Sequence, residues 1–190
     1  MKENEVILKR QSTRVFFKNG DTDFFFNWLL GIGEVFGFSH GELYYLAQKL
    51  GNSPKPDDWK NEFLSHVNYL EQKVSNLGLS EQTKAQYYLA QTYSLRSAIQ
   101  FTNPFSAEYL PIVCQMEKAF SSAIHSLGTP IEKLTIACQD SYLPGYYLHS
   151  GDNCPTLIMI GGGDTYREDL FYFAGYPGWI RNYNVLMVDL

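Results

Sequence analysis

The sequence predicts a chain that passes from an α-helical bundle to the first part of an α/β sheet, a fold class between α+β and α/β. Apolar residues recur at steps of three and four up to about residue 129, and short β-rich runs replace that pattern from Ile131 onward. A run of glycines at 161–163 then separates a buried strand from a helix. We therefore divide the 190 residues into a helical domain over 1–130 and the start of a sheet domain over 131–190.

Helical periodicity predicts four helices before residue 130. The first is expected over about 23–50, where Gly33 and neighbouring glycines would let another backbone approach closely at some cost in helix propensity. The other three are predicted over 59–77, from an N-cap at Ser80 to residue 99, and from an N-cap at Ser106 to residue 127. Gly128, followed closely by Pro130, is a helix-stop signal.

Short strands follow the last predicted helix. We expect two of them at 134–139 and 146–149, separated by a turn at Leu143-Pro144-Gly145. The apolar run 156–160 predicts a strand buried on both faces, and after a helix at about 166–182 a second buried strand begins at Val185. A strand, a helix and a strand form a βαβ unit with parallel pairing and a right-handed crossover. Since this sheet has hardly begun at Leu190, we expect an incomplete domain.

Composition excludes several functional classes. The formal charge of −5 and the pI near 5.3 argue against nucleic acid as the main partner, because phosphate binding needs a basic face. No segment has the length and apolarity of a membrane span or the pattern of a signal peptide. The three cysteines and four histidines are scattered, so neither a disulfide nor a metal site is predicted. We expect a cytoplasmic protein without a metal or organic cofactor.

The glycine turn carries the strongest chemical signal. Gly161-Gly162-Gly163-Asp164 lies between a buried strand and a predicted helix, where glycines can adopt dihedral angles closed to other residues and bring amide groups close to a ligand. The dipole of the helix would add positive potential, so this turn suits an oxygen that develops negative charge. The alternative is that the glycines only make a tight connection between a strand and a helix.

The segments around this turn resemble the opening of the α/β-hydrolase core. They read LPGYYL at 143–148, PTLIMIGGGDTYREDL at 155–170 and YNVLMVDL at 183–190. The helical half resembles the group of these enzymes that has an N-terminal helical cap, which includes pseudooxynicotine hydrolase-like and acylaminoacyl-peptidase-like proteins. That likeness rests on FNW at 26–28, GFSHGELYY at 37–45 and the alanines and tyrosines of 85–90.

The resemblance implies the N-terminal portion of a serine hydrolase that cleaves ester, amide or carbon–carbon bonds next to a carbonyl. Gly162 and Gly163 match the turn that supplies an oxyanion-binding amide, and Gly163 is the expected donor. Asp164 and the stretch 165–168 match the adjacent helix start, with a capping role. Phe26 and Trp28 are candidates for lining the substrate pocket, although core packing would also explain each aromatic residue.

The catalytic serine, acid and histidine of this family would all lie beyond residue 190. The expected partners are a small-molecule or short-peptide substrate and the remainder of the hydrolase core, with a homodimer as a further assembly. In the complete enzyme the helical cap would close over the site and exclude water.

A second motif imitates a nucleophile. Gly37-Phe38-Ser39-His40-Gly41 fits the Gly-x-Ser-x-Gly pattern of a nucleophile elbow, but an elbow requires a buried strand before the serine. This copy also precedes the glycine turn, whereas the elbow follows it in chain order. We therefore interpret its glycines as packing residues.

Two other functions stay open. A strand, a glycine turn, a helix and then Asp189 fit a dinucleotide-binding unit with an acidic ribose ligand, although Tyr166 stands where that fingerprint has its third glycine. The helical half could instead be a scaffold that binds proteins, although no clean internal repeat is present.

Overall fold

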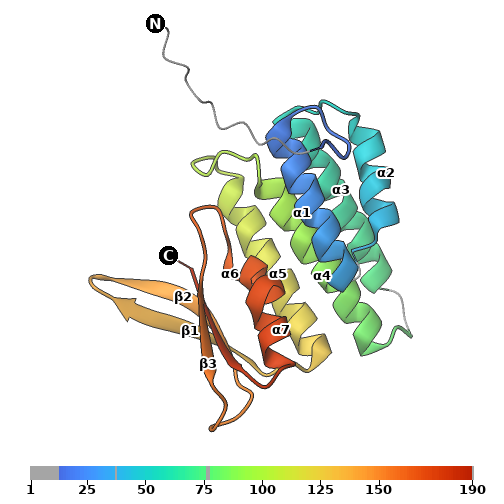
Figure 1. The fold of residues 1–190 in the computed structure, drawn as a ribbon. Helices are drawn as coiled ribbons and strands as arrows, with labels where there is room; N and C mark the ends of the chain where they lie inside the picture. Colours follow the sequence, from blue (N-terminus) through green and yellow to red (C-terminus); the bar gives the residue numbers. More distant parts are fainter. Residues whose placement is uncertain (1–12, 37, 76–77, 190) are drawn as a thin grey trace, which may run out of the picture.

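The computed structural model describes residues 13–36, 38–75 and 78–189, in which a helical bundle packs beside a small mixed sheet (Figure 1). The bundle consists of α1 (Gly20–Phe36), α2 (His40–Leu50), α3 (Pro56–Val74), α4 (Glu81–Ile99) and α5 (Tyr109–Leu127). The sheet contains β1 (Ile131–Cys138), β2 (Ser141–Leu148), β3 (Thr156–Ile160) and β4 (Asn184–Val188). Between β3 and β4 the chain forms α6 (Arg167–Leu170), the π-helix η1 (Phe171–Gly175) and α7 (Tyr176–Trp179).

The single helix predicted over 23–50 is wrong, because α1 and α2 are separate helices. Phe38, which lies between the two helices, is so close to α1 that a Cβ atom on Gly33 would overlap its carbonyl oxygen. Glycine at position 33 therefore permits the close backbone approach that the sequence predicted, but the approaching backbone is that of Phe38, a near neighbour in the sequence.

The helix ends show which capping signals the chain uses. Ser80 is the N-cap of α4, and its Oγ accepts a hydrogen bond from the Thr83 amide at 3.1 Å, as predicted. Gly128 ends α5 with a left-handed φ of 62°, which confirms the stop signal. The N-cap predicted at Ser106 is wrong: α5 begins at Tyr109, and the Ser106 hydroxyl donates to the Asn103 carbonyl in the preceding turn.

Helix α4 lies at the centre of the bundle. Every residue from Leu89 to Ile99 is buried, including the polar residues Ser94, Arg96 and Ser97. The apolar face predicted on α3 packs against it, and the indole N–H of Trp59 donates to the Ser97 carbonyl at 2.9 Å. Buried polar side chains need hydrogen-bond partners inside the protein, so the polar residues on α4 indicate specific contacts.

The strands lie in the order β1-β2-β4-β3, with antiparallel pairing except between β3 and β4. The turn predicted at 143–145 is wrong because these residues lie inside β2, and the chain reverses instead at Gln139, which has a φ of 51°. Pro144 fits a strand here because its nitrogen, which has no hydrogen to donate, faces β4 at a position just outside the residues of β2 that pair with β4. Its carbonyl accepts from the Asp189 amide at 3.0 Å.

The parallel pairing of β3 with β4 confirms the predicted βαβ unit. β4 lies between two strands and is largely buried, as expected. The prediction that β3 is buried on both faces is wrong, because the side chains of Ile158 and Ile160 are 61% and 56% exposed. Among the described strands β3 pairs with β4 alone, and Figure 1 shows helices on one side of the sheet.

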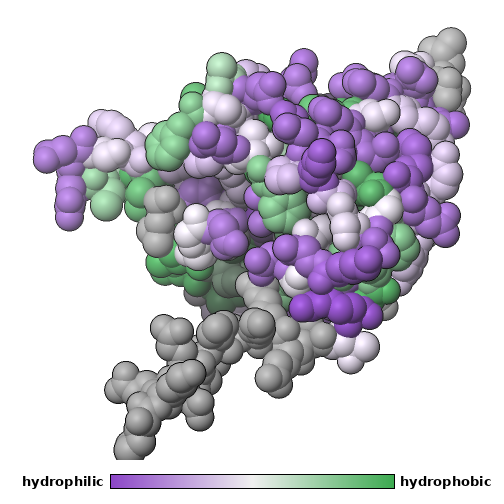
Figure 2. Space-filling view, turned by 90° about the horizontal axis from the view of Figure 1, so that it is seen from above, coloured by the Kyte–Doolittle hydropathy of each residue, from purple (hydrophilic) through white to green (hydrophobic). Residues whose placement is uncertain are grey.

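Hydrophobic residues at the surface seen from above form separate groups among predominantly hydrophilic ones (Figure 2). None of the helices in the described segments is both long enough and apolar enough to cross a membrane.

Candidate active site

The glycine run forms a β-turn directly after β3. The Thr165 amide donates to the Gly162 carbonyl at 3.1 Å and closes the turn. Between these two residues, the amides of Gly163 and Asp164 make no hydrogen bond to any described residue. The turn therefore presents two adjacent backbone N–H groups that can donate hydrogen bonds to a ligand oxygen.

Space, and not backbone conformation, explains Gly161. None of residues 161–163 has a positive φ, so the expectation of dihedral angles closed to other residues is wrong. A Cβ atom on Gly161 would lie 3.0 Å from the Cβ of Thr165, whereas a Cβ on Gly163 would meet no atom within 4 Å. Gly161 is thus required for close packing, and Gly163 leaves the turn open on one side.

The helix predicted at about 166–182 is present over 167–179, and it starts two residues after the end of the turn. α6 begins at Arg167, and Tyr166 is its N-cap. The Oδ2 atom of Asp169 accepts from the Tyr166 amide at 3.1 Å, so the capping role expected of Asp164 belongs to Asp169. The amides of the glycine turn are consequently separate from those of the helix start. In a dinucleotide-binding fold the glycine turn leads directly into the N-terminus of the helix. The separation seen here therefore disfavours that alternative.

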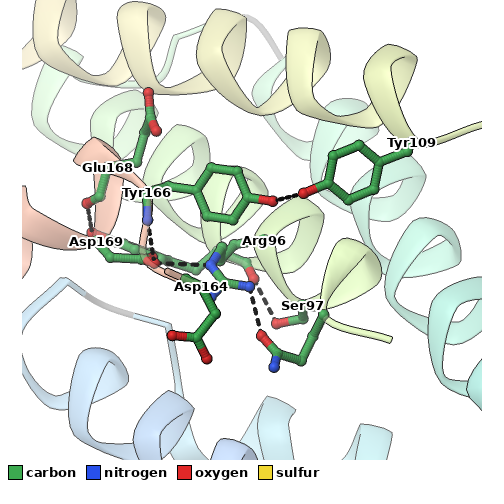
Figure 3. A network of polar contacts seen from close by, with 9 residues as sticks. Arg96, Ser97, Tyr109, Asp164, Tyr166, Glu168 and Asp169 are labelled. Carbon is green, nitrogen blue, oxygen red and sulfur yellow. Dashed lines mark hydrogen bonds and ion pairs between the residues drawn. The ribbon is translucent and has the colours of Figure 1, made fainter. Parts of the chain in front are cut away.

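A buried arginine of the helical bundle holds the turn. Arg96 on α4 donates from Nε to Asp169 Oδ2 at 2.9 Å, from Nη1 to Gln100 Oε1 at 2.7 Å and from Nη2 to the Asp164 carbonyl at 2.8 Å (Figure 3). Its guanidinium carbon lies 4.8 Å from the ring centroid of Tyr166. The bundle therefore fixes the peptide that follows the two unpaired amides.

A second polar network supports the start of α6. Tyr146 on β2 donates to Glu168 Oε1 at 2.7 Å, and Arg167 forms an ion pair with Glu117 on α5. Burial raises the pKa values of the Glu168 and Asp169 carboxyls, although the nearby arginines oppose this effect. Burial, with the negative charge of Glu168, also raises the pKa of Asp189 to about 7.

Two adjoining hollows lie between the bundle and the glycine turn. We call the first, with a volume of about 420 Å³, the turn hollow; Gly163, Asp164, Tyr166, Asp189 and Tyr109 are among the residues that line it. The second, of about 450 Å³, is the aromatic hollow, which Phe24, Phe25, Trp28, Phe101 and Phe173 line together with polar residues. Arg96, Gln100, Asp164 and Thr165 line both. Their size is that of ordinary small-molecule sites.

The residues that the sequence predicted for the site do not all lie at the two hollows. Gly163 lies at the turn hollow, and the carbonyl of Gly162 closes the turn beside it. Trp28 lines the aromatic hollow. Phe26 does not: its side chain is 1% exposed, and its ring packs against Phe17 and other core residues, so core packing was the correct alternative for this residue.

Ser39 lies between two helices, at the N-terminus of α2, so the strand that an elbow requires is missing. Gly37 of this motif lies outside the described residues. Among the described residues, no group of three His, Cys, Asp or Glu side chains is arranged to hold a metal ion.

Sequence reasoning missed Arg96 and Asp169, the ion pair that joins the two halves of the chain. The sequence contained a signal for a buried arginine, because Arg96 lies between Leu95 and Ile99 in a helix that has apolar residues on its other faces as well. Its partner could not be found in this way, since the two residues lie 73 positions apart.

Comparisons with known proteins place this geometry in context. No protein-family model matches the chain. It is 24% identical over 180 residues to hydrolyase ccsE of Aspergillus clavatus and 24% identical over 182 residues to alpha/beta hydrolase ucsC of an Acremonium species. Each alignment covers 85% of this chain, but only 41% and 37% of those proteins. The chain thus spans less than half the length of these curated relatives.

A crystal structure of 2,6-dihydroxy-pseudo-oxynicotine hydrolase superposes with a TM-score of 0.62 at 19% sequence identity. The superposition covers 85% of this chain and 45% of that one. A helical N-terminal region followed by a small mixed sheet is therefore an arrangement shared with a known hydrolase.

Proposed function

We propose, from the premise that this chain is related to the α/β-hydrolase superfamily, that it forms the helical cap and the first four strands of a serine-type hydrolase. The reaction would cleave an ester, an amide or a carbon–carbon bond next to a carbonyl. Its substrate would be a small molecule or a short peptide.

One observation carries the proposal: the amides of Gly163 and Asp164 make no hydrogen bond within the part of the chain that the structure describes, and both residues line a hollow between the bundle and the glycine turn. During acyl transfer the carbonyl oxygen of the substrate becomes an oxyanion, which such donors stabilise more strongly than they stabilise the neutral carbonyl. The Arg96 contact to the Asp164 carbonyl supports the proposal, because donors that are held in place need no reorganisation when charge develops.

The nucleophile is proposed to lie outside residues 1–190, on the remainder of the hydrolase core. The free edge of β3 supports this view, since its backbone offers a place for a further strand. Ile158 and Ile160 give that strand an apolar face that helices do not cover. In parallel α/β sheets both faces are normally covered, so additional elements are expected on this side.

The bundle would act as a cap over the reaction. Residues of α1 and α4 line the hollows opposite the glycine turn, so a substrate placed at the turn would touch both halves of the chain. This position suits a cap that excludes water and limits substrate size.

The test uses the full-length protein that carries these residues, treated with a fluorophosphonate that labels activated serines. We expect one labelled serine beyond residue 190, together with hydrolysis of p-nitrophenyl acetate that the label abolishes. Residues 1–190 alone should show neither. Absence of labelling and of hydrolysis in the folded full-length protein would refute the serine mechanism, and a rate of residues 1–190 that Ser39→Ala abolishes would restore Ser39 as the nucleophile.

A further inference from the structure

A third hollow lies on the helical bundle, with a volume of about 330 Å³. Its lining residues all belong to α2 and α3, so we call it the α2–α3 hollow. None of these residues lines the turn hollow or the aromatic hollow. Figure 1 shows α2 on the side of the bundle away from the sheet. The hydrolase reaction proposed above therefore makes no use of this hollow.

His66 on α3 lines the α2–α3 hollow and has one unpaired nitrogen. The residue is only 7% exposed, and its ring stacks on Phe38 and Tyr69 with centroid distances of 5.5 and 5.9 Å. Its Nδ1 atom lies 2.9 Å from Ser94 Oγ on α4, whereas the buried Nε2 atom has no hydrogen-bond partner among the described residues. Buried polar atoms are normally hydrogen-bonded, so Nε2 is left for a partner in the hollow.

Ser94 determines which nitrogen of His66 carries the proton. The Ser94 hydroxyl donates its single hydrogen to the Ala90 carbonyl at 2.7 Å, so its oxygen can only accept from the imidazole. Nδ1 is therefore protonated, and Nε2 presents a lone pair. Burial, together with the positive charge of Lys49, lowers the pKa of His66 to about 4, which keeps the ring neutral at pH 7. The partner that Nε2 lacks is thus a hydrogen-bond donor.

The charges around the hollow favour a neutral donor. Lys49 Nζ lies 5.5 Å from the ring centroid of Tyr45, and Lys73 Nζ lies 5.0 Å from that of Tyr69. Each of these two exposed rings already holds an ammonium group, so a further cation would meet like charge. An anion would meet the carboxylate of Glu42, which also lines the hollow.

The rest of the lining is suited to an aromatic ring. Leu46 is buried, while Tyr45 and Tyr69 are 61% and 44% exposed at the same hollow. Exposed side chains change rotamer within nanoseconds, so Tyr69 can turn to let a ligand reach the imidazole. A hydrogen bond formed at Nε2 would be shielded from water, which strengthens it.

We propose that the α2–α3 hollow binds a small neutral molecule that carries a hydroxyl group beside an aromatic ring. The hydroxyl donates to His66 Nε2, and the ring packs on Leu46 and on the two tyrosines. The volume of the hollow is at the lower end of the range for small-molecule sites, which limits the ligand to a compact one. This site is separate from the glycine turn, so the hydrolase function can stand if the site fails, and the reverse.

The test is a titration of the 190-residue chain with three probes of similar size: benzyl alcohol, benzyl methyl ether, which has no donor, and benzylammonium, which is a cationic donor. The ring nitrogens of isotope-labelled histidine report the site by NMR. Before any probe is added, His66 should be neutral at pH 7 with its proton on Nδ1. Benzyl alcohol should shift the Nε2 signal and bind at least about fivefold more tightly than either other probe, as one added hydrogen bond predicts.

Substitutions separate the acceptor from the apolar contacts. His66→Phe keeps a ring beside Phe38 and Tyr69 but removes the acceptor, so the affinity for benzyl alcohol should fall to that for the ether. Tyr69→Ala should weaken the binding of both neutral probes. His125→Phe is the matched control, because His125 is exposed on α5 and does not line the hollow; it should leave all three affinities unchanged.

Four results would overturn the inference. They are a proton on Nε2 in the chain without probe, absence of an Nε2 shift with benzyl alcohol, equal or weaker binding of the alcohol compared with the ether or benzylammonium, and a preference for the alcohol that persists in His66→Phe. The first three are measured on the unmodified chain, so they decide the matter even if His66→Phe does not fold.

Discussion

Replacing Gly163 with proline removes one amide hydrogen from the glycine turn and changes little else. Gly163 is the second residue of the turn, where proline is favoured, and its φ is not positive. A Cβ atom there would meet no atom within 4 Å. Both Gly163→Pro and the control Gly163→Ala should therefore fold, and each should raise the free energy of unfolding by about 0.4–1 kcal/mol through the unfolded chain.

Catalysis should separate the two variants. If the Gly163 amide donates to the oxyanion, Gly163→Pro should lower kcat by about 10²–10³, the usual effect of losing one such donor, with little change in KM. Gly163→Ala keeps the amide and should retain a rate near that of the unmodified enzyme. The assay is p-nitrophenyl acetate hydrolysis by the full-length protein, with urea unfolding to verify stability. A proline variant that stays within threefold of the alanine variant would refute the assigned role.

Three further predictions concern the contacts around the turn and the sheet edge. Arg96→Met leaves the Asp169 carboxylate buried without its cation and should lower the free energy of unfolding by about 3–5 kcal/mol in urea titration; Arg96→Met with Asp169→Asn should recover part of this loss. The folded-state pKa of Asp189 is raised to about 7 from 3.8, so its contribution to stability is complete below about pH 4 and is lost as the pH rises through 7. Asp189→Asn should accordingly make the chain more stable than the unmodified one at pH 8 but not at pH 4, and an equal difference at both would contradict the assignment. Ile158→Lys places a charge on the exposed face of β3 and should reduce self-association of residues 1–190 in sedimentation, with stability changed by less than about 0.5 kcal/mol.

The sequence predicted the elements that local patterns determine. Helix α4 begins at its Ser80 cap, α5 ends at Gly128, and the β3–β4 unit is parallel, because capping, left-handed glycine and apolar runs act over a few residues. The error at β2 arises from contacts outside the local window. Pro144 and Gly145 usually indicate a turn, but pairing with β1 over the whole of β2 holds them in a strand.

The candidate site was predictable only in its backbone. The glycine run marked the turn, because few other sequences allow Thr165 to pack so closely against Gly161. The side chains that hold this turn come from α4, and residue spacing contains no information on which helix packs against it. The exposure of β3 was likewise hidden, since an apolar run is the same whether or not its neighbours are present.

The ion pair between Arg96 and Asp169 has a consequence for protein engineering. A cut at the change from helices to strands, near residue 130, would look natural on secondary structure, yet it would leave a buried cation on one fragment and a buried anion on the other. Chimaeras that graft a foreign helical half onto this sheet should therefore inherit both residues from the same parent. Junctions placed after residue 170 would satisfy that requirement, whereas junctions at residue 130 would separate the two charges between unrelated sequences.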